Sequence, residues 1–357
     1  MKVFWWVLSV LLLTGNAFAT SIQHQPPLWG YQLEGRVNTL VCSNNSLFVG
    51  DDRGIHNIGY SRNILWEYTT YSTVTSVDEQ DNEVIVASSD GIIRSFGKNG
   101  QLLWERTVPG YVGLPKALKL DKDMILAGSM DGFVYLFDRK GTYRWKRQIG
   151  SYVTEIDLVG ETIVAISDRQ VYFLDLEGKV KRNLDIKGYI RKASVVQDKV
   201  AIALEDNKLY LYDLKGNILW DKDIVHDITS LDGKNDLILG TAGGIIYNLA
   251  LNGSVNWMDN TTYPVLAVKD GGGYVIASTL EGKTILYSGL GKVRSYYSTE
   301  GRVLLFDACD NNIVAGTSKG RVFFSKIPKK DPMSTTLAIG GVFIVSLLAV
   351  YMVYRSW

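Results

Sequence analysis

Residues 85–104 read IVASSDGIIRSFGKNGQLLW, and this pattern returns along most of the chain. It contains an apolar run ending in small residues, a turn with glycine, a second β-rich run, and then glycine and tryptophan. Ile125–Phe137 (ILAGSMDGFVYLF) and Leu237–Tyr247 (LILGTAGGIIY) repeat its first part. Short apolar runs separated by turn residues predict antiparallel strands joined by tight hairpins.

The turn residue of this pattern recurs eight times. It stands at Gly54, Gly91, Gly132, Arg169, Asn207, Gly244, Gly282 and Gly320, at intervals of 37 to 41 residues. A nearly constant interval of this length is typical of repeat architectures. We therefore predict an all-β fold, an eight-bladed β-propeller with four-stranded blades that occupies residues 20–327.

A second mark ends most of the units. Tryptophan stands there at Trp66, Trp104, Trp145, Trp220 and Trp257, while Arg182 and Ser295 hold this position in two others. Glycine precedes the last four of these tryptophans by four residues. The final unit stops near Ile327 without such a strand, whereas Leu28–Tyr31 contains one that has no unit of its own. We predict that this N-terminal strand completes the last blade and closes the ring, which removes an exposed sheet edge.

This Gly-x-x-x-Trp repeat resembles that of the quinoprotein-type (PQQ-like) propellers, over residues 28–327. The family includes quinone-dependent alcohol dehydrogenases and an outer-membrane assembly scaffold lipoprotein. The resemblance implies eight blades, with tryptophans that dock between neighbouring blades. It implies little about function, because one architecture hosts unrelated activities.

The two ends of the chain carry targeting signals. Residues 1–19 have a basic start, an apolar run and a small-x-small site, which predict a secretory signal peptide. Residues 335–354 are uncharged and long enough to cross a bilayer as one helix. With a short linker at 328–334 and a cytoplasmic tail at 355–357, these features predict a single-pass membrane protein whose propeller is extracytoplasmic.

Charge and motifs exclude several functions. The chain has 38 Lys and Arg against 37 Asp and Glu, which argues against nucleic acid as a partner. The three histidines are far apart and form no metal-ligand motif. The sequence also has no adjacent cysteine pair and no inserted loop that would cover a cofactor, so we expect no cofactor. Single acids near the inner strands, such as Glu155, Asp157 and Asp227, are interpreted as solvated turn residues, and so are those of Asp78–Glu83.

Another position recurs just after the tryptophan strand, where the chain crosses to the next unit. It is occupied by Arg36, Tyr71, Tyr111, Tyr152, Tyr189, His226, Tyr263 and Arg302. In a propeller these connections lie on one face, around the channel mouth. Repeated tyrosines with nearby arginines suit the stacking of sugars or the binding of a peptide. The alternative is that the tyrosine rings pack between blades and leave only their hydroxyl groups in water.

Arg36 and Arg302 belong to units that adjoin at the closure of the ring. Their like charges are predicted to attract an acidic group on a ligand. Together with Tyr111, Tyr152, Tyr189, His226 and Tyr263 they are our candidate ligand-binding residues.

The two cysteines occupy matching places in the first and last units. Cys42 and Cys309 are able to form a disulfide across the seam if their Cα atoms approach within ~7 Å, and two separate buried thiols are the alternative. Three triplets, which begin at Asn44, Asn252 and Asn260, match the N-glycosylation pattern in predicted turns.

These features predict a membrane-anchored, non-catalytic binding or scaffold module whose partner is an envelope protein or a surface glycan. Two alternatives stay open. One is a quinone (PQQ)-dependent oxidoreductase, and the other is a membrane-protein assembly factor.

Overall fold

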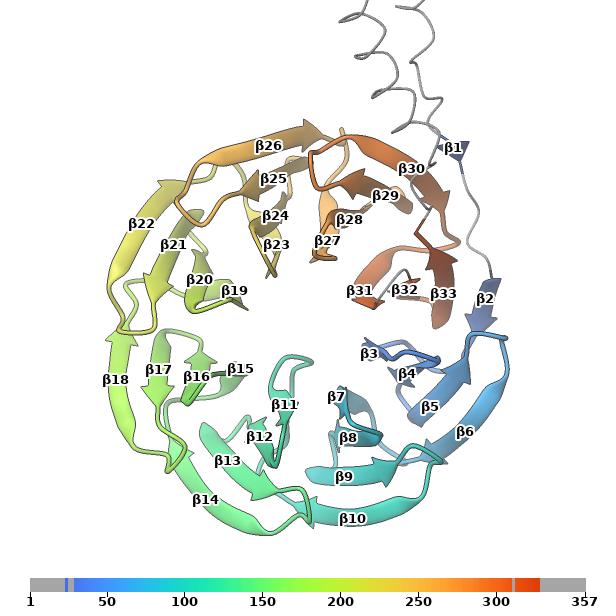
Figure 1. The fold of residues 1–357 in the computed structure, drawn as a ribbon, viewed down its shortest axis with the longest axis vertical. Helices are drawn as coiled ribbons and strands as arrows, with labels where there is room; N and C mark the ends of the chain where they lie inside the picture. The colour runs from blue at the N-terminus through green and yellow to red at the C-terminus, as the bar shows by residue number, and fades with distance from the viewer. Residues whose placement is uncertain (1–22, 25–28, 310–311, 328–357) are drawn as a thin grey trace, which may run out of the picture. The chain divides into compact units, whose positions relative to one another are not determined.

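The computed structural model describes residues 23–24, 29–309 and 312–327. The predicted signal peptide (1–19), linker (328–334), transmembrane helix (335–354) and tail (355–357) lie outside these residues. In the described part of the chain, no helix has the length and apolar character needed to cross a membrane. The described residues form eight sheets arranged as a ring around a central opening, as predicted (Figure 1).

The first four blades follow one another along the chain. Blade 1 comprises β3 (Thr39–Cys42), β4 (Ser46–Gly50), β5 (Gly54–Gly59) and β6 (Ile64–Thr69). Blade 2 comprises β7 (Val74–Gln80), β8 (Glu83–Ser88), β9 (Ile92–Gly97) and β10 (Leu102–Thr107). Blade 3 comprises β11 (Leu118–Asp121), β12 (Met124–Gly128), β13 (Phe133–Asp138) and β14 (Tyr143–Gln148). Blade 4 comprises β15 (Val153–Val159), β16 (Thr162–Ser167), β17 (Gln170–Leu174) and β18 (Val180–Asp185).

The other four blades complete the ring. Blade 5 comprises β19 (Ile190–Val196), β20 (Lys199–Leu204), β21 (Lys208–Asp213) and β22 (Ile218–Asp223). Blade 6 comprises β23 (Ile228–Gly233), β24 (Leu237–Thr241), β25 (Ile245–Leu249) and β26 (Val255–Asn260). Blade 7 comprises β27 (Val265–Asp270), β28 (Tyr274–Thr279), β29 (Lys283–Ser288) and β30 (Val293–Ser298). Blade 8 comprises β31 (Val303–Cys309), β32 (Asn312–Thr317), β33 (Arg321–Lys326) and the N-terminal β2 (Trp29–Gln32).

The predicted closure of the ring is confirmed. β2 pairs antiparallel with β33, from Trp29 opposite Phe324 to Gln32 opposite Arg321. The indole of Trp29 stacks on the Phe324 ring at 5.5 Å and donates a hydrogen bond to the Tyr60 carbonyl of blade 1 at 2.9 Å. The N-terminal strand therefore completes blade 8 and also fastens it to blade 1.

A fifth strand on blade 7 is a feature that the repeat did not predict. β1 (Gln23–His24) pairs in parallel with β30, opposite Ser295 and Tyr296. Ser295 is one of the two places where the repeat lacks its tryptophan. The outer edge of β30 is thus partly covered at that point.

Tryptophans dock six of the eight blades onto the next, as the family resemblance implied. The indole N–H of Trp104 donates to the Arg139 carbonyl of blade 3 at 2.8 Å, and its ring lies against Gly141. A Cβ atom at Gly141 would come within 2.6 Å of that ring, so only glycine fits. The repeat glycine therefore leaves room for the tryptophan ring of the preceding blade. In blade 4 the side chain of Arg182 takes this place and lies against Gly216.

The hairpin between the second and third strands explains most of the repeat glycines. Gly91 has φ +78°, and Asn207 takes the same left-handed region with φ +67°. Gly54 does not have a positive φ. It is required because a Cβ there would lie 2.1 Å from the Tyr68 carbonyl oxygen.

The hydrophobic core is divided among the blade interfaces. One cluster joins Phe48 of blade 1 to Val74 and Phe96 of blade 2, and each of the three is almost wholly buried. Each blade therefore depends on its neighbours for burial, and the ring gains its full stability only when it is closed.

Candidate functional site

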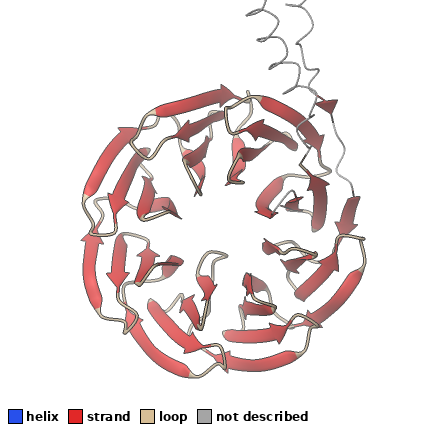
Figure 2. Ribbon diagram, in the orientation of Figure 1, coloured by secondary structure: helices blue, strands red, loops and turns tan. Residues whose placement is uncertain are grey.

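The antiparallel order of each blade determines which loops share a face. Figure 2 shows the chain passing from the outer strand of one blade to the inner strand of the next. Because each blade has four antiparallel strands, this connection lies on the same face of the ring in every repeat. The structure places the seven candidate residues in these connections: Arg36, Tyr111, Tyr152, Tyr189, His226, Tyr263 and Arg302. We call the surface formed by these connections the mouth face. The hairpins between second and third strands also lie on it.

Most of the candidate side chains are open to solvent. Tyr111, Tyr189 and Tyr263 are 38%, 50% and 43% exposed, and Tyr152 is partly buried. Arg36, His226 and Arg302 are exposed. Tyr71, which holds the equivalent place in blade 2, is 94% exposed. These side chains therefore offer aromatic and cationic surface to a ligand.

Two candidate side chains, Tyr189 and His226, also contact hairpins between second and third strands. The guanidinium of Arg169 lies 4.6 Å from the centre of the Tyr189 ring. The imidazole of His226 lies so close to Gly243 that a Cβ there would come within 2.0 Å. Among the described residues, no hydrogen bond or ring contact joins one of the seven candidates to another. The structure thus brings them to one face without joining them into a cluster.

The inner strands bring one equivalent residue per blade into the channel, and in six of the eight blades this residue is charged. This position is held by Val41, Asp78, Lys119, Asp157, Ser194, Asp232, Lys269 and Asp307, all of which line one cavity of about 480 Å³. The order contains two Asp–Lys–Asp groups separated by Val41 and Ser194. We call these groups the channel triads.

Ion pairs join the members of the triads. The ammonium of Lys119 lies 3.2 Å from Asp157, and that of Lys269 lies 3.4 Å from Asp307 and 4.0 Å from Asp232. Burial alone would lower the pKa of Lys119, but the nearby aspartates raise it above its ordinary value. These lysines therefore stay charged in the channel.

Three of these aspartates also bind the backbone of the next blade. Asp78 accepts a hydrogen bond from the Leu120 amide at 2.7 Å, and Asp307 accepts one from the Cys42 amide at 2.8 Å. Asp232 accepts one from the Asp270 amide at 2.9 Å. Burial raises the pKa of Asp78 to about 6. Because their oxygens are engaged in fastening blades together, these aspartates have a structural role.

The interpretation of the inner-strand acids Glu155 and Asp157 as solvated turn residues was wrong. Glu155 and Asp157 are two residues apart on β15, so both project toward the channel. Glu155 is buried beside Lys116 at 3.4 Å, and burial raises its pKa to about 7. The spacing of the acids in the sequence did not reveal which face of the strand they share.

The acids of the 78–83 hairpin and Asp227 were also expected to be solvated. Glu83 is buried and accepts a hydrogen bond from the Ser95 hydroxyl at 2.5 Å. Asp81 is exposed, as predicted for a hairpin. Asp227 is an exposed residue before β23, and its carboxylate pairs with Arg191 at 2.8 Å.

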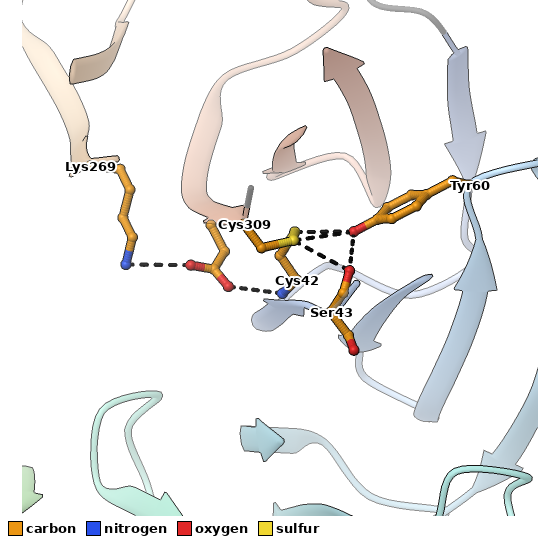
Figure 3. The surroundings of a disulfide bond; sticks show 6 residues. Cys42, Ser43, Tyr60, Lys269 and Cys309 are labelled. Atoms are coloured by element: carbon orange, nitrogen blue, oxygen red, sulfur yellow. Dashed lines mark hydrogen bonds and ion pairs between the residues drawn. A yellow bond between two sulfur atoms is a disulfide. The ribbon is translucent and has the colours of Figure 1, made fainter. Parts of the chain in front are cut away.

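The two cysteines meet at the seam of the ring. Cys42 of β3 and Cys309 of β31 form a disulfide, with their Cα atoms 5.7 Å apart (Figure 3). The Tyr60 hydroxyl lies 3.1 Å from the Cys42 sulfur and donates to the Ser43 carbonyl at 2.5 Å. Blades 8 and 1 are therefore joined covalently at the channel and by β2 at the rim.

The three candidate glycosylation sites lie at the surface of the propeller. Asn44 and Asn252 are exposed in turns, whereas Asn260 is the exposed last residue of β26.

His56 lies between Asp51 at 3.2 Å and Glu67 at 3.3 Å, an arrangement that no sequence motif indicated. Burial would lower the pKa of His56, but these carboxylates raise it. In the described residues, no group of three or more His, Cys, Asp or Glu is suited to hold a metal ion.

The family comparison agrees with the repeat. Residues 14–188, slightly less than half of the chain, match the family model described as outer membrane protein assembly factor BamB. The chain is thus an eight-bladed β-propeller with a quinoprotein-type repeat. Its repeat is similar to that of BamB. A search of curated proteins found no match.

Solved structures share the fold at low sequence identity. BamB from Moraxella catarrhalis has a TM-score of 0.69 at 14% identity, covering 84% of this chain and 99% of that one. Sqt1 from Saccharomyces cerevisiae has a TM-score of 0.75 at 13% identity, covering 86% and 100%. The computationally designed protein Ika8 has a TM-score of 0.74 at 21% identity, covering 85% and 100%. At such identities these likenesses establish the fold alone.

Proposed function

We propose that this chain is a membrane-tethered, extracytoplasmic scaffold that binds a protein partner on its mouth face and has no catalytic activity of its own. The observation that carries this proposal is the set of exposed tyrosines and arginines in equivalent connections. Tyrosine and arginine are enriched at the energetic centres of protein interfaces. Tyr111, Tyr189 and Tyr263 each expose more than a third of their surface, although apolar side chains would pack equally well.

Similar proteins support a protein partner over a glycan. The matching family is described as an assembly factor, and one similar structure is Chaetomium thermophilum Sqt1 bound to the N-terminus of ribosomal protein L10. The uncharged segment at 335–354 supports the membrane tether, and residues 1–19 support export. These features favour an envelope protein as the partner, with a surface glycan as the alternative.

The double substitution Arg36→Gln and Arg302→Gln is expected to weaken partner binding about tenfold or more. Both guanidinium groups are exposed, so their removal leaves the fold intact while it removes charge-assisted hydrogen bonds to an acidic group. The measurement is capture of partners from detergent-solubilised native membranes by the full-length protein, at two salt concentrations.

Lys215→Gln is the matched control for this experiment, because Lys215 is exposed in a turn on the opposite face. It should capture partners as the wild type does. A lower melting temperature with unchanged capture in the double variant would show that the arginines are structural, and the mouth face would lose its assigned role.

A further inference from the structure

The half of the channel nearest the mouth face has an excess of cations. Its cavity of about 410 Å³ is lined by the first residues of the inner strands, which follow the mouth-face connections. The charged residues of this lining are Lys116, Arg191, Lys192, Lys269, Glu155 and Asp232. The cavity of the channel triads shares Lys116, Glu155, Asp232 and Lys269 with it but lacks Arg191 and Lys192, and it has an excess of carboxylates. The channel is therefore electrically asymmetric along its axis.

Most of the mouth-side cations have anionic partners. Arg191 pairs with Asp227 at 2.8 Å, and Lys269 pairs with Asp307 at 3.4 Å. Lys116 lies 3.4 Å from Glu155 and also donates to the Ala193 carbonyl at 3.2 Å. Lys192 is different, because no carboxylate of the described residues lies within ion-pairing distance of it.

The side chain of Lys192 is exposed within the channel, whose sides are formed by the inner strands. Its ammonium lies near two other cations, Lys116 and Arg191. Burial and the positive charges of Lys116 and Arg191 lower the pKa of Lys192, and the carboxylate of Glu155 only partly offsets them. Like charges this close repel one another unless an anion stands between them.

The same cavity also has an apolar wall. Leu266 of β27, and Leu304 and Phe306 of β31, are only partly buried there. Figure 1 places β19, which holds Lys192, and β31 on facing sides of the central opening. A ligand that spans the cavity would therefore contact a cationic wall on one side and an apolar wall on the other.

We propose that this cavity binds a carboxylate attached to an apolar group, with Lys192 and Lys116 on the carboxylate and Leu304 and Phe306 on the apolar part. The carboxylate adds the missing anion, and the apolar part covers side chains that otherwise face water. Glu155 repels an incoming anion only partly at neutral pH, since its pKa is raised to about 7. The natural source is either a partner polypeptide or a free organic acid. A partner polypeptide as the source rests on the proposed function. Binding of a carboxylate with an apolar group in this cavity does not depend on that function.

Calorimetry with the full-length protein tests the site without any partner. The probes are N-acetylphenylalanine, its amide, and acetate. We expect N-acetylphenylalanine to bind and the amide and acetate to bind at least about tenfold more weakly, because one lacks the charge and the other lacks the apolar group. Equal binding of the amide, or no binding of N-acetylphenylalanine, would overturn the proposal.

Two variants locate the site. Lys192→Gln should weaken N-acetylphenylalanine binding about tenfold without lowering the melting temperature, because it relieves repulsion in the empty channel. Lys187→Gln, an exposed change just before the same inner strand, should bind as the wild type does. Binding by Lys192→Gln at wild-type strength would place the ligand elsewhere and reject the proposal.

A further probe separates the two sources. A pentapeptide that ends in phenylalanine with a free carboxylate should displace N-acetylphenylalanine if a polypeptide supplies the group, and fail to do so if only small acids enter. Both results require the same cavity. Failure of these probes together with wild-type partner capture would reject this site and leave the proposed scaffold function standing.

Discussion

We expect the propeller that lacks residues 20–34 to be unfolded at physiological temperature, so that heating it shows no cooperative unfolding transition. The deletion takes away β2, the stack of Trp29 on Phe324, and the buried side chain of Leu33. Losing the buried Leu33 and the partly buried Trp29, and exposing the face of β33, costs about 5 kcal/mol or more. A whole domain is stable by only about 5–15 kcal/mol, so this loss is decisive.

Deletion of residues 20–24 is the matched control, because it removes β1 and leaves β2 in place. Its melting temperature should stay close to that of the wild type, since β1 pairs with β30 at only two positions. Differential scanning calorimetry of both proteins makes the comparison. A wild-type transition after deletion of 20–34 would mean that β2 does not close the ring.

Replacing both cysteines by serine is expected to lower the unfolding free energy by roughly 2–4 kcal/mol. The disulfide closes a loop with a sequence separation of 267 residues, which restricts the unfolded chain strongly. The loss should be smaller than that of β2, because the rim closure keeps blades 8 and 1 together. Chemical denaturation of the wild type and of the double serine variant, with and without reductant, measures it.

Reductant should destabilise the wild type and leave the serine variant unchanged. Equal stability of wild type and serine variant under oxidising conditions would contradict a bonded seam.

The repeat pattern was sufficient to predict the ring. The nearly constant interval between turn residues predicted eight blades. The strand at Trp29, which belongs to no complete repeat, predicted closure by the N-terminus. Both features can be recognised from short stretches of sequence. The partner of Gly141 was not predictable in this way. It faces Trp104 of the preceding blade, a contact that depends on how neighbouring blades stack.

The grouping of charged residues in the channel was not predicted from the sequence. Asp78, Lys119 and Asp157 come from three different blades, so no local motif joins them. Their common place on the inner strands is visible only after the repeats are aligned strand by strand. Lys192 was missed for the same reason, because its isolation from carboxylates is a property of the assembled channel.

Site-specific photocrosslinking in intact cells tests the scaffold function most directly. A photoreactive phenylalanine analogue would replace Tyr189 or Tyr263 on the mouth face, or Lys215 on the opposite face, in the full-length protein. We predict crosslinks to the same envelope protein from positions 189 and 263, and none from position 215. Crosslinks that form equally well from position 215, or that are absent from both mouth positions, would contradict partner binding at the mouth face.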